Sequence, residues 1–192
     1  MPGKQMSPAR DADWANDAPR LEVLFSADAI ATRMDALARE VADRCGRHLL
    51  VIAILKGSFI FAADLIRALH RAGSTPEVDF LSLASYGNAT VSSGVVTVLR
   101  DIETAVAGRD VLLIDDILES GRTLAFAQAH IRERGARQVL TCVLLDKAVT
   151  RTANIEADFR AFQCPDVFVV GYGMDKAHRY RELPFVGRIV PS

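Results

Sequence analysis

Apolar positions along the chain change their spacing at intervals, and each change marks a new element. The first stripe has the spacing of an α-helix, with Ser26 before it as an N-cap and Gly46 after it as a stop. Its members are Ile30, Met34, Leu37 and Val41. Residues 49–55 then form an unbroken apolar run, which is typical of a strand buried on both faces. The pattern therefore predicts a helix followed by an interior strand.

The same alternation continues through most of the chain. A second helix is predicted between residue 58 and Gly73, and a third over residues 124–134 before Gly135. Further strands are predicted over residues 77–84, 95–100, 111–114, 139–145, 167–170 and 186–190. Buried strands joined by helices predict the α/β class, with a central, mainly parallel sheet flanked by helices.

Polar segments follow five of the predicted strands. They comprise residues 56–58, 85–94, 115–123, 146–147 and 171–175. Open α/β sheets bind their ligands beyond the carboxyl ends of the strands. We therefore expect the five segments to meet at one edge of one sheet and to form the ligand site there.

Composition narrows the class of protein. The 192 residues suffice for one domain with its own core, and 50% apolar with 24% charged residues excludes disordered and fibrous proteins. The net charge of −1 argues against nucleic acid or a membrane surface as partner, and no apolar run approaches the ~20 residues of a membrane span. Three cysteines without C-x-x-C spacing indicate a reducing, cytoplasmic location. Residues 1–20 are polar and are predicted to be a mobile N-terminal arm on a single domain of residues 21–192.

One loop carries the strongest chemical signal. A buried strand leads into Asp115 and Asp116, and a short run of small and hydroxyl residues then enters a helix. Backbone N–H groups at that helix start, with the hydroxyls of Ser120 and Thr123, would cradle a phosphate, and Gly121 would let the backbone approach it. The two acids suit the hydroxyls of a ribose or a bridging Mg²⁺. The same residues also fit an ordinary helix cap with solvated acids, although paired acids at the end of a buried strand need polar partners.

The stretch 111–124 resembles the phosphoribosyl-diphosphate motif of the type I phosphoribosyltransferases. Over residues 21–190, further loops resemble one branch, the bacterial hypoxanthine (hypoxanthine-guanine) phosphoribosyltransferases. The matching segments are Leu55-Lys56-Gly57-Ser58, Ser85-Tyr86-Gly87, residues 90–94, Leu145-Asp146-Lys147, residues 165–173 with Asp175, and residues 180–184. The resemblance implies the type I phosphoribosyltransferase fold with a small hood built from the chain ends, to which residues 160–192 contribute over a purine site.

The activity that the resemblance implies is purine salvage. The 5-phosphoribosyl group would pass from phosphoribosyl diphosphate to hypoxanthine, and to guanine, giving IMP or GMP and pyrophosphate, with Mg²⁺ as cofactor. Asp115 and Asp116 would hold the ribose hydroxyls. The 5-phosphate would be bound by Glu119, Ser120, Gly121, Arg122 and Thr123. Glu119 would also be the general base for the purine N7 proton, a role that many members of the family give to Asp.

The remaining roles come from the same resemblance. Lys147 would donate to the purine O6, Phe168 would stack on the base, and Val169 would offer backbone groups to its edge. Asp175 would belong to the same purine site and, with Asp115 and Asp116, would act on Mg²⁺, largely through substrate and water. The pyrophosphate would be bound by Lys56, Gly57, Ser85, Tyr86 and Arg181.

Other features of the pyrophosphate side also follow from the resemblance. A non-proline cis peptide is expected at Lys56–Gly57, and residues 85–94 would close over the site. Lys176 and Ala177 depart from the aromatic and polar residues that the family more often has after Asp175.

Each of these residues also has a simpler interpretation. Glu119 fits an exposed first-turn acid, Lys147 a solvated lysine, and Phe168 a core side chain, while Asp175 and Arg181 each fit a member of some surface salt bridge.

Two alternatives to the implied activity remain. One is a non-enzymatic regulator that senses nucleotides on the same fold, and the other is an enzyme that prefers xanthine. The complete set of site residues and the lack of a second and third N-terminal helix favour the enzyme. Relatives of this kind are homodimers or homotetramers, with small-molecule substrates and no nucleic-acid or membrane partner.

Overall fold

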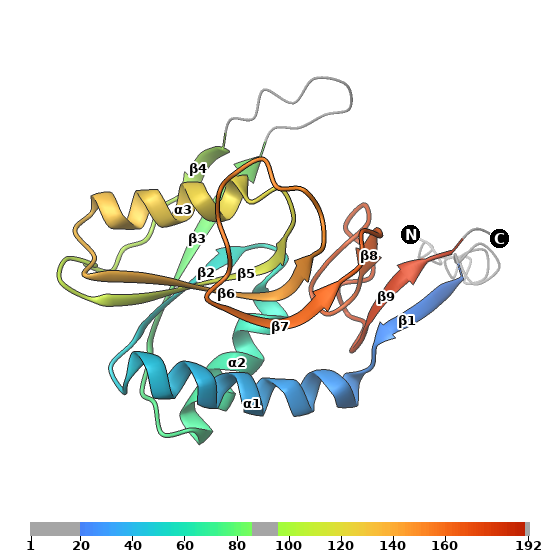
Figure 1. Ribbon diagram of the computed structural model, residues 1–192, viewed down its shortest axis with the longest axis horizontal. Helices are drawn as coiled ribbons and strands as arrows, with labels where there is room; N and C mark the ends of the chain where they lie inside the picture. Colours follow the sequence, from blue (N-terminus) through green and yellow to red (C-terminus); the bar gives the residue numbers. More distant parts are fainter. Residues whose placement is uncertain (1–19, 86–95, 191–192) are drawn as a thin grey trace, which may run out of the picture.

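The computed structural model describes residues 20–85 and 96–190, and in them the chain forms two sheets and three helices (Figure 1). The helices are α1 (Ala27–Cys45), α2 (Phe59–Arg71) and α3 (Arg122–Glu133). The larger sheet contains β2 (Leu50–Leu55), β3 (Glu77–Ser85), β4 (Val96–Arg100), β5 (Asp110–Leu118), β6 (Gln138–Lys147) and β7 (Phe159–Cys164). The smaller sheet contains β1 (Leu21–Phe25), β8 (Val169–Val170) and β9 (Val186–Ile189). The predicted arm, except Arg20, and most of the predicted closing loop lie outside the described residues.

The larger sheet has the strand order β4-β3-β2-β5-β6-β7. Its strands are parallel except β4, which runs antiparallel to β3. Helices α1 and α2 cover one face and α3 covers the other (Figure 1). The predicted α/β class with a mainly parallel sheet is therefore confirmed.

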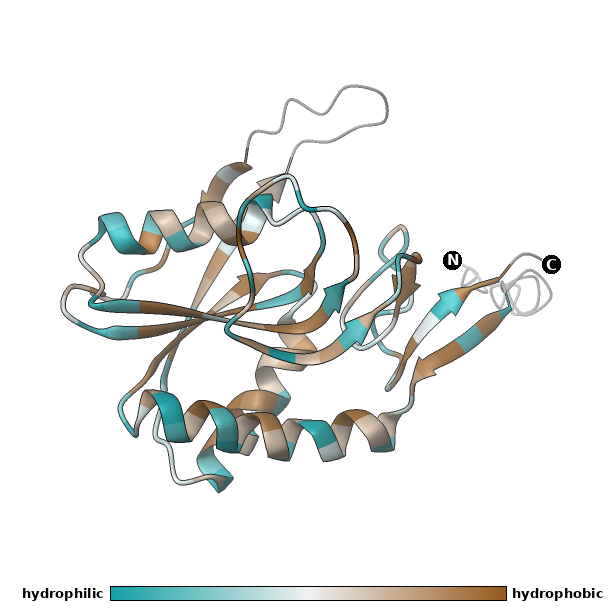
Figure 2. Ribbon diagram, in the orientation of Figure 1, coloured by the Kyte–Doolittle hydropathy of each residue, from teal (hydrophilic) through white to brown (hydrophobic). Residues whose placement is uncertain are grey.

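Two apolar cores lie on either side of this sheet. On β2, Val51 and Ala53 belong to the core beneath α1 and α2, whereas Leu50 and Ile52 belong to the core beneath α3. All four are fully buried, and Figure 2 shows the central strands as largely hydrophobic ribbons. An interior strand needs apolar residues on both faces, which explains its unbroken apolar run.

Helix α1 has the limits and the face that the sequence predicts. The Ser26 hydroxyl accepts a hydrogen bond from the Ala29 amide at 3.2 Å, and Gly46 ends the helix with φ of +74°. The predicted stripe is buried, together with Ala38. Arg33, on the side of the helix, donates to the backbone carbonyls of Arg160 and Ala161 and thereby ties α1 to β7.

The edge strand beside β6 is not the strand that the sequence predicted to follow it, residues 167–170. That position belongs to β7, which the apolar pattern did not predict, because a short edge strand interrupted by the exposed residues Arg160 and Gln163 lacks a continuous apolar run. Of the predicted strand 167–170, only β8 forms, and it pairs with β9 in the smaller sheet. Figure 1 shows the smaller sheet beside the carboxyl ends of β6 and β7. The expectation that all five polar segments follow strands of one sheet was therefore wrong for residues 171–175.

Two strands are longer than predicted, and their extra residues carry the polar side chains. Strand β5 continues through Asp115 and Asp116 to Leu118 because it keeps pairing with β6, which continues to Lys147. On its other side β5 pairs with β2 only as far as Ile114. Strand β2 itself continues to Leu55, so the two acids lie where the pairing between β5 and β2 has stopped, and that opening is where the site forms.

Among the helices that the structure describes, none is long and apolar enough to cross a membrane.

Candidate active site

Two adjacent carboxylates lie at the centre of the site. Asp115 is only 6% exposed, and its Oδ1 accepts a hydrogen bond from the Asp116 amide at 3.0 Å. Burial raises the pKa of Asp115 well above its usual value, and the negative charge of Asp116 adds to the rise. Burial also raises the pKa of Asp116, while hydrogen bonds and the positive charge of Arg181 oppose that rise. The pair therefore favours a cation or a hydroxyl donor beside it.

Three segments from different parts of the chain meet at Asp116. A Cβ on Gly57 would lie 1.7 Å from Asp116 Oδ2, and a Cβ on Gly173 would lie 2.3 Å from the Gly57 carbonyl oxygen. Gly173 also has φ of +100°, a conformation that side chains disfavour. The segments after β2 and β8 can therefore approach β5 only because both positions are glycine.

The peptide bond that enters the first of these segments is cis. It is the Leu55–Lys56 bond, so the prediction of a cis bond at Lys56–Gly57 was wrong by one residue.

The loop between β5 and α3 encloses a cavity of about 210 Å³. Its lining comprises Asp115, Ile117, Leu118, Glu119, Ser120, Gly121, Thr123 and Leu124. Helix α3 begins after Gly121, whose φ of +79° turns the chain, and no side chain caps it. The Ser120 hydroxyl accepts only a long contact, 3.4 Å, from the Arg122 amide. The helix-cap interpretation of Ser120 is therefore weak, and the first amides of α3 remain suited to an anion.

Lys147 and Glu119 form an ion pair beside this cavity. Lys147 is 6% exposed, and its Nζ lies 2.9 Å from Glu119 Oε1 and 3.9 Å from Asp166 Oδ1. Lys147 is thus not a solvated lysine. Asp166 belongs to the matching segment 165–173, but the sequence indicated no role for it.

The aromatic residue directly before β8 is exposed. Phe168 is 58% exposed, although Val169 beside it is buried. The core interpretation of Phe168 is therefore wrong, and its ring is free to stack on a planar ligand.

Asp175 and Arg181 hold the loop after β8 in shape. Arg181 Nη2 lies 2.6 Å from Asp175 Oδ1, and its Nη1 donates to the Gly173 carbonyl at 2.6 Å. Asp175 Oδ2 also accepts from the His178 amide at 2.7 Å. Between them, Lys176 and Arg179 exchange backbone hydrogen bonds. Lys176 and Ala177, the two residues that differ from the usual family pattern, therefore start a tight turn in which Ala177 has a left-handed conformation.

The other predicted residues are placed as follows. Ser85 ends β3, and nothing is described of its side chain, while Tyr86 lies outside the described residues. Within the described ranges, no group of three or more His, Cys, Asp or Glu side chains could hold a metal ion. The buried pair of Asp115 and Asp116 fits Mg²⁺, which takes few carboxylates and keeps oxygens from substrate and water.

Two anchoring contacts had no signal in the sequence. The Tyr172 hydroxyl donates to Asp64 Oδ2 at 2.7 Å and ties the loop after β8 to α2. The amides of Thr152 and Ala153 each donate to the Ser120 carbonyl at 3.1 Å. Both contacts join positions at least 32 residues apart, so local patterns do not reveal them.

The fold and the site together define a phosphoribosyltransferase. The family model described as "Phosphoribosyl transferase domain" matches residues 22–177, and the chain belongs to this family.

Among curated relatives, the hypoxanthine-guanine phosphoribosyltransferase of Bacillus subtilis is 43% identical over 172 residues, covering 89% of this chain and 94% of that protein. The hypoxanthine phosphoribosyltransferase of Escherichia coli is 36% identical and covers 88% of this chain and 96% of its own length.

A solved structure extends the match to three dimensions. The hypoxanthine-guanine phosphoribosyltransferase of Bacillus anthracis superposes with a TM-score of 0.83 at 38% identity, covering 90% of this chain and 100% of that one. The bifunctional TilS/HprT protein of Listeria innocua is 45% identical over 172 residues, and this chain spans 26% of its length.

The buried acid pair predicts a gain in stability when one charge is removed. The raised pKa of Asp115 means that its ionised form is disfavoured in the folded chain, a cost present at neutral pH and lost as the pH falls through the raised value. Asp115→Asn, measured with a chelator present, should raise the melting temperature at pH 8 by about 2–4 °C, the shift that ~1 kcal/mol causes in a domain of this size. The gain should shrink at pH 5. Asp43→Asn, at an exposed position, is the control; an equal gain there would contradict the explanation.

Proposed function

We propose that the protein is a purine-salvage enzyme that transfers the 5-phosphoribosyl group from phosphoribosyl diphosphate to hypoxanthine and guanine, releasing pyrophosphate. One observation carries the proposal: Lys147 Nζ lies 2.9 Å from Oε1 of Glu119, and Glu119 lines the cavity before α3. A base reader, a proton acceptor and an anion cradle are thus adjacent. The names of the Bacillus and Escherichia coli relatives support the same activity.

The purine is read by two groups that are already neighbours. Lys147 donates to O6, and because an ammonium cannot accept a hydrogen bond, it disfavours the 6-amino group of adenine. Glu119 holds the proton of N7, the atom next to O6 on the same edge of the base. The 2.9 Å separation of the two side chains supports this division of roles. Phe168 stacks on the ring, and the backbone of Val169 meets its far edge.

The phosphoribosyl group is held by the loop before α3. Ser120, Gly121, Arg122 and Thr123 bind the 5-phosphate with the first amides of the helix, while Asp115 and Asp116 bind the ribose hydroxyls. Positioning of this kind supplies much of the rate of group transfer. Mg²⁺, when bound by Asp115, Asp116 and, through water, Asp175, neutralises charge on the pyrophosphate.

The leaving pyrophosphate is bound on the opposite side of the acids. Lys56, Gly57, Ser85, Tyr86 and Arg181 bind it, and closure of residues 85–94 keeps water from the ribosyl carbon. The position of Gly57 against Asp116 supports this, because it brings the pyrophosphate segment beside the ribose segment.

The chain is further proposed to act in the cytoplasm as a homodimer or homotetramer. All three cysteines are free thiols, which suits a reducing compartment. Val78 and Phe80 lie on one face of β3 and are 36% and 46% exposed. Apolar side chains exposed together on a sheet face support contact with a second copy.

The activity is tested by offering hypoxanthine, guanine, xanthine and adenine separately, with phosphoribosyl diphosphate and Mg²⁺, and following nucleotide formation by absorbance. We expect turnover with hypoxanthine and guanine and none with adenine. Turnover mainly with xanthine would move the base preference. No turnover with any base, from protein shown to be folded, would overturn the proposal and leave a nucleotide-sensing role.

Glu119→Gln should lower kcat by about 10²–10⁴-fold, the usual contribution of a general base, with the KM for phosphoribosyl diphosphate within about threefold of the parent value. The carboxylate is lost but the shape of the cavity is kept. Steady-state kinetics with hypoxanthine measure both constants, and a variant with full kcat would remove Glu119 from the mechanism.

Lys147→Met keeps the apolar stem of the buried side chain and removes its donor. The KM for hypoxanthine should rise about 10–100-fold, the value of a hydrogen bond to a charged group. The KM for phosphoribosyl diphosphate should stay nearly constant. An unchanged hypoxanthine KM would show that Lys147 does not read the base.

Phe80→Lys places a charge on the exposed face of β3 and should shift the molar mass from an oligomer to a monomer in light scattering after gel filtration. Val23→Lys, at a 51% exposed position of β1, is the control and should leave the mass unchanged. An oligomer of unaltered mass in Phe80→Lys would place the contact elsewhere.

A further inference from the structure

The back of the phosphate loop rests on a segment about thirty residues further along the chain. The Ser120 carbonyl accepts three hydrogen bonds from that segment, two from the amides of Thr152 and Ala153 and one from the Thr152 hydroxyl, each at 3.1 Å. A Cβ on Gly121 would lie 2.7 Å from Ile155 Cγ2. Residues 152–155 therefore fix the path of the chain through residues 120 and 121.

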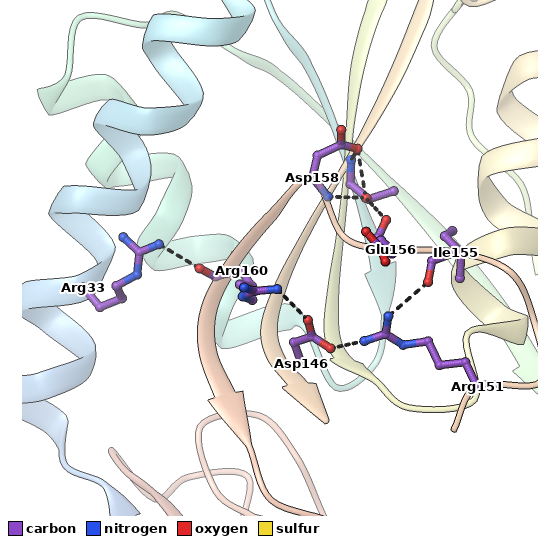
Figure 3. Close-up of polar contacts among 8 residues, drawn as sticks. Arg33, Asp146, Arg151, Ile155, Glu156, Asp158 and Arg160 are labelled. Atoms are coloured by element: carbon purple, nitrogen blue, oxygen red, sulfur yellow. Dashed lines mark hydrogen bonds and ion pairs between the residues drawn. The ribbon is translucent and has the colours of Figure 1, made fainter. Parts of the chain in front are cut away.

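One arginine holds this segment in place. Arg151 Nη2 pairs with Asp146 Oδ1 at the end of β6, and its Nη1 donates to the Ile155 carbonyl at 3.2 Å (Figure 3). The Arg151 side chain is 20% exposed and that of Asp146 is 5% exposed. The guanidinium therefore joins the start of the segment, the strand before it and the far end of the segment in one mostly buried contact.

A second arginine binds the same carboxylate from the other side. Arg160 Nη1 lies 3.2 Å from Asp146 Oδ2, and Arg160 belongs to β7 (Figure 3). Its backbone carbonyl accepts from Arg33 of α1. Arg160 thus shares Asp146 with Arg151, but its backbone contact with Arg33 leads toward α1 and not toward the phosphate loop.

We infer that Arg151 is a positioning residue for the 5-phosphate: by joining Asp146 to Ile155, it presses Thr152 and Ala153 against Ser120 and keeps the amides of residues 120–123 in the shape that binds the anion. Arg151 does not line the cavity and acts only through the segment that it holds. The inference rests on the proposed function for its kinetic consequence, while the structural consequence stands apart from it.

The two arginines provide a matched pair of variants. Arg151→Gln should raise the KM for phosphoribosyl diphosphate by about tenfold or more, because a displacement of about 1 Å at a binding loop can cost up to 10²-fold, while the KM for hypoxanthine stays within about threefold. Arg160→Gln should leave both constants within about threefold. Arg151→Lys can reach Asp146 but cannot also bind Ile155, and should lie between. Equal rises in Arg151→Gln and Arg160→Gln would overturn the inference, because loss of charge around Asp146 would then be the cause.

Amide hydrogen exchange gives a readout that needs no turnover. Peptides covering residues 118–124 should exchange faster in Arg151→Gln than in the parent protein, and at the parent rate in Arg160→Gln. Unchanged exchange in Arg151→Gln would overturn the inference even if the enzyme is active. If the parent protein turned over no substrate, the proposed function would fail, and the exchange comparison would still decide the role of Arg151.

A milder variant covers the case in which Arg151→Gln does not fold. Thr152→Val removes one of the three hydrogen bonds to Ser120, together with the hydroxyl that accepts from Arg122 Nε at 3.0 Å, and keeps the backbone amides. It should raise the KM for phosphoribosyl diphosphate by about threefold and speed exchange in the same peptides, since a neutral hydrogen bond contributes about 0.5–1.5 kcal/mol. Parent values for both measurements would overturn the inference.

Discussion

Two carboxylates side by side in a buried strand carry an electrostatic cost, and much of the site is arranged around it. Asp115 and Asp116 lie where β5 still pairs with β6 but no longer pairs with β2, so they have a paired strand on one side and an opening on the other. Gly57 fills that opening without a side chain, and the charge of Arg181 reaches Asp116. The negative charge that remains uncompensated favours ligands with hydroxyls or a bound cation. The electrostatic repulsion that lowers the stability of the ligand-free protein therefore strengthens binding.

The sheet around the acids has the stability to bear that cost. Strands β2, β5 and β6 are almost wholly buried, and they supply apolar residues to both cores. Burial of each such side chain contributes about 1.5–3 kcal/mol. The charged residues of the site lie at the carboxyl ends of β5 and β6 and directly after β2, at the edge facing the smaller sheet. Stability and chemistry are thus separated along each strand and not between different elements.

Periodicity predicted α1, the interior strands and the order of polar segments because those features are local. It did not predict β7, a short edge strand whose apolar residues are interrupted by Arg160 and Gln163, nor the separation of β8 into a second sheet. The contact of Gly57 with Asp116 joins positions 59 residues apart, and the hold of Thr152 on Ser120 joins positions 32 apart. No spacing in the sequence reports such distances. The resemblance to a family assigned roles to the site residues one by one, but it did not indicate Arg151 or Asp146 as supports, since neither meets a ligand.

The stack of Gly57, Gly173 and Asp116 also limits how this chain can diverge. Each member excludes added volume at the next, so a larger residue at one position needs a compensating change in a segment that lies far away in the sequence. A single substitution by a larger residue is therefore not tolerated at Gly57 or Gly173. Phe168, by contrast, faces solvent with room around it. Variation in the choice of base can accumulate there, while the part of the site that holds ribose and phosphate stays fixed.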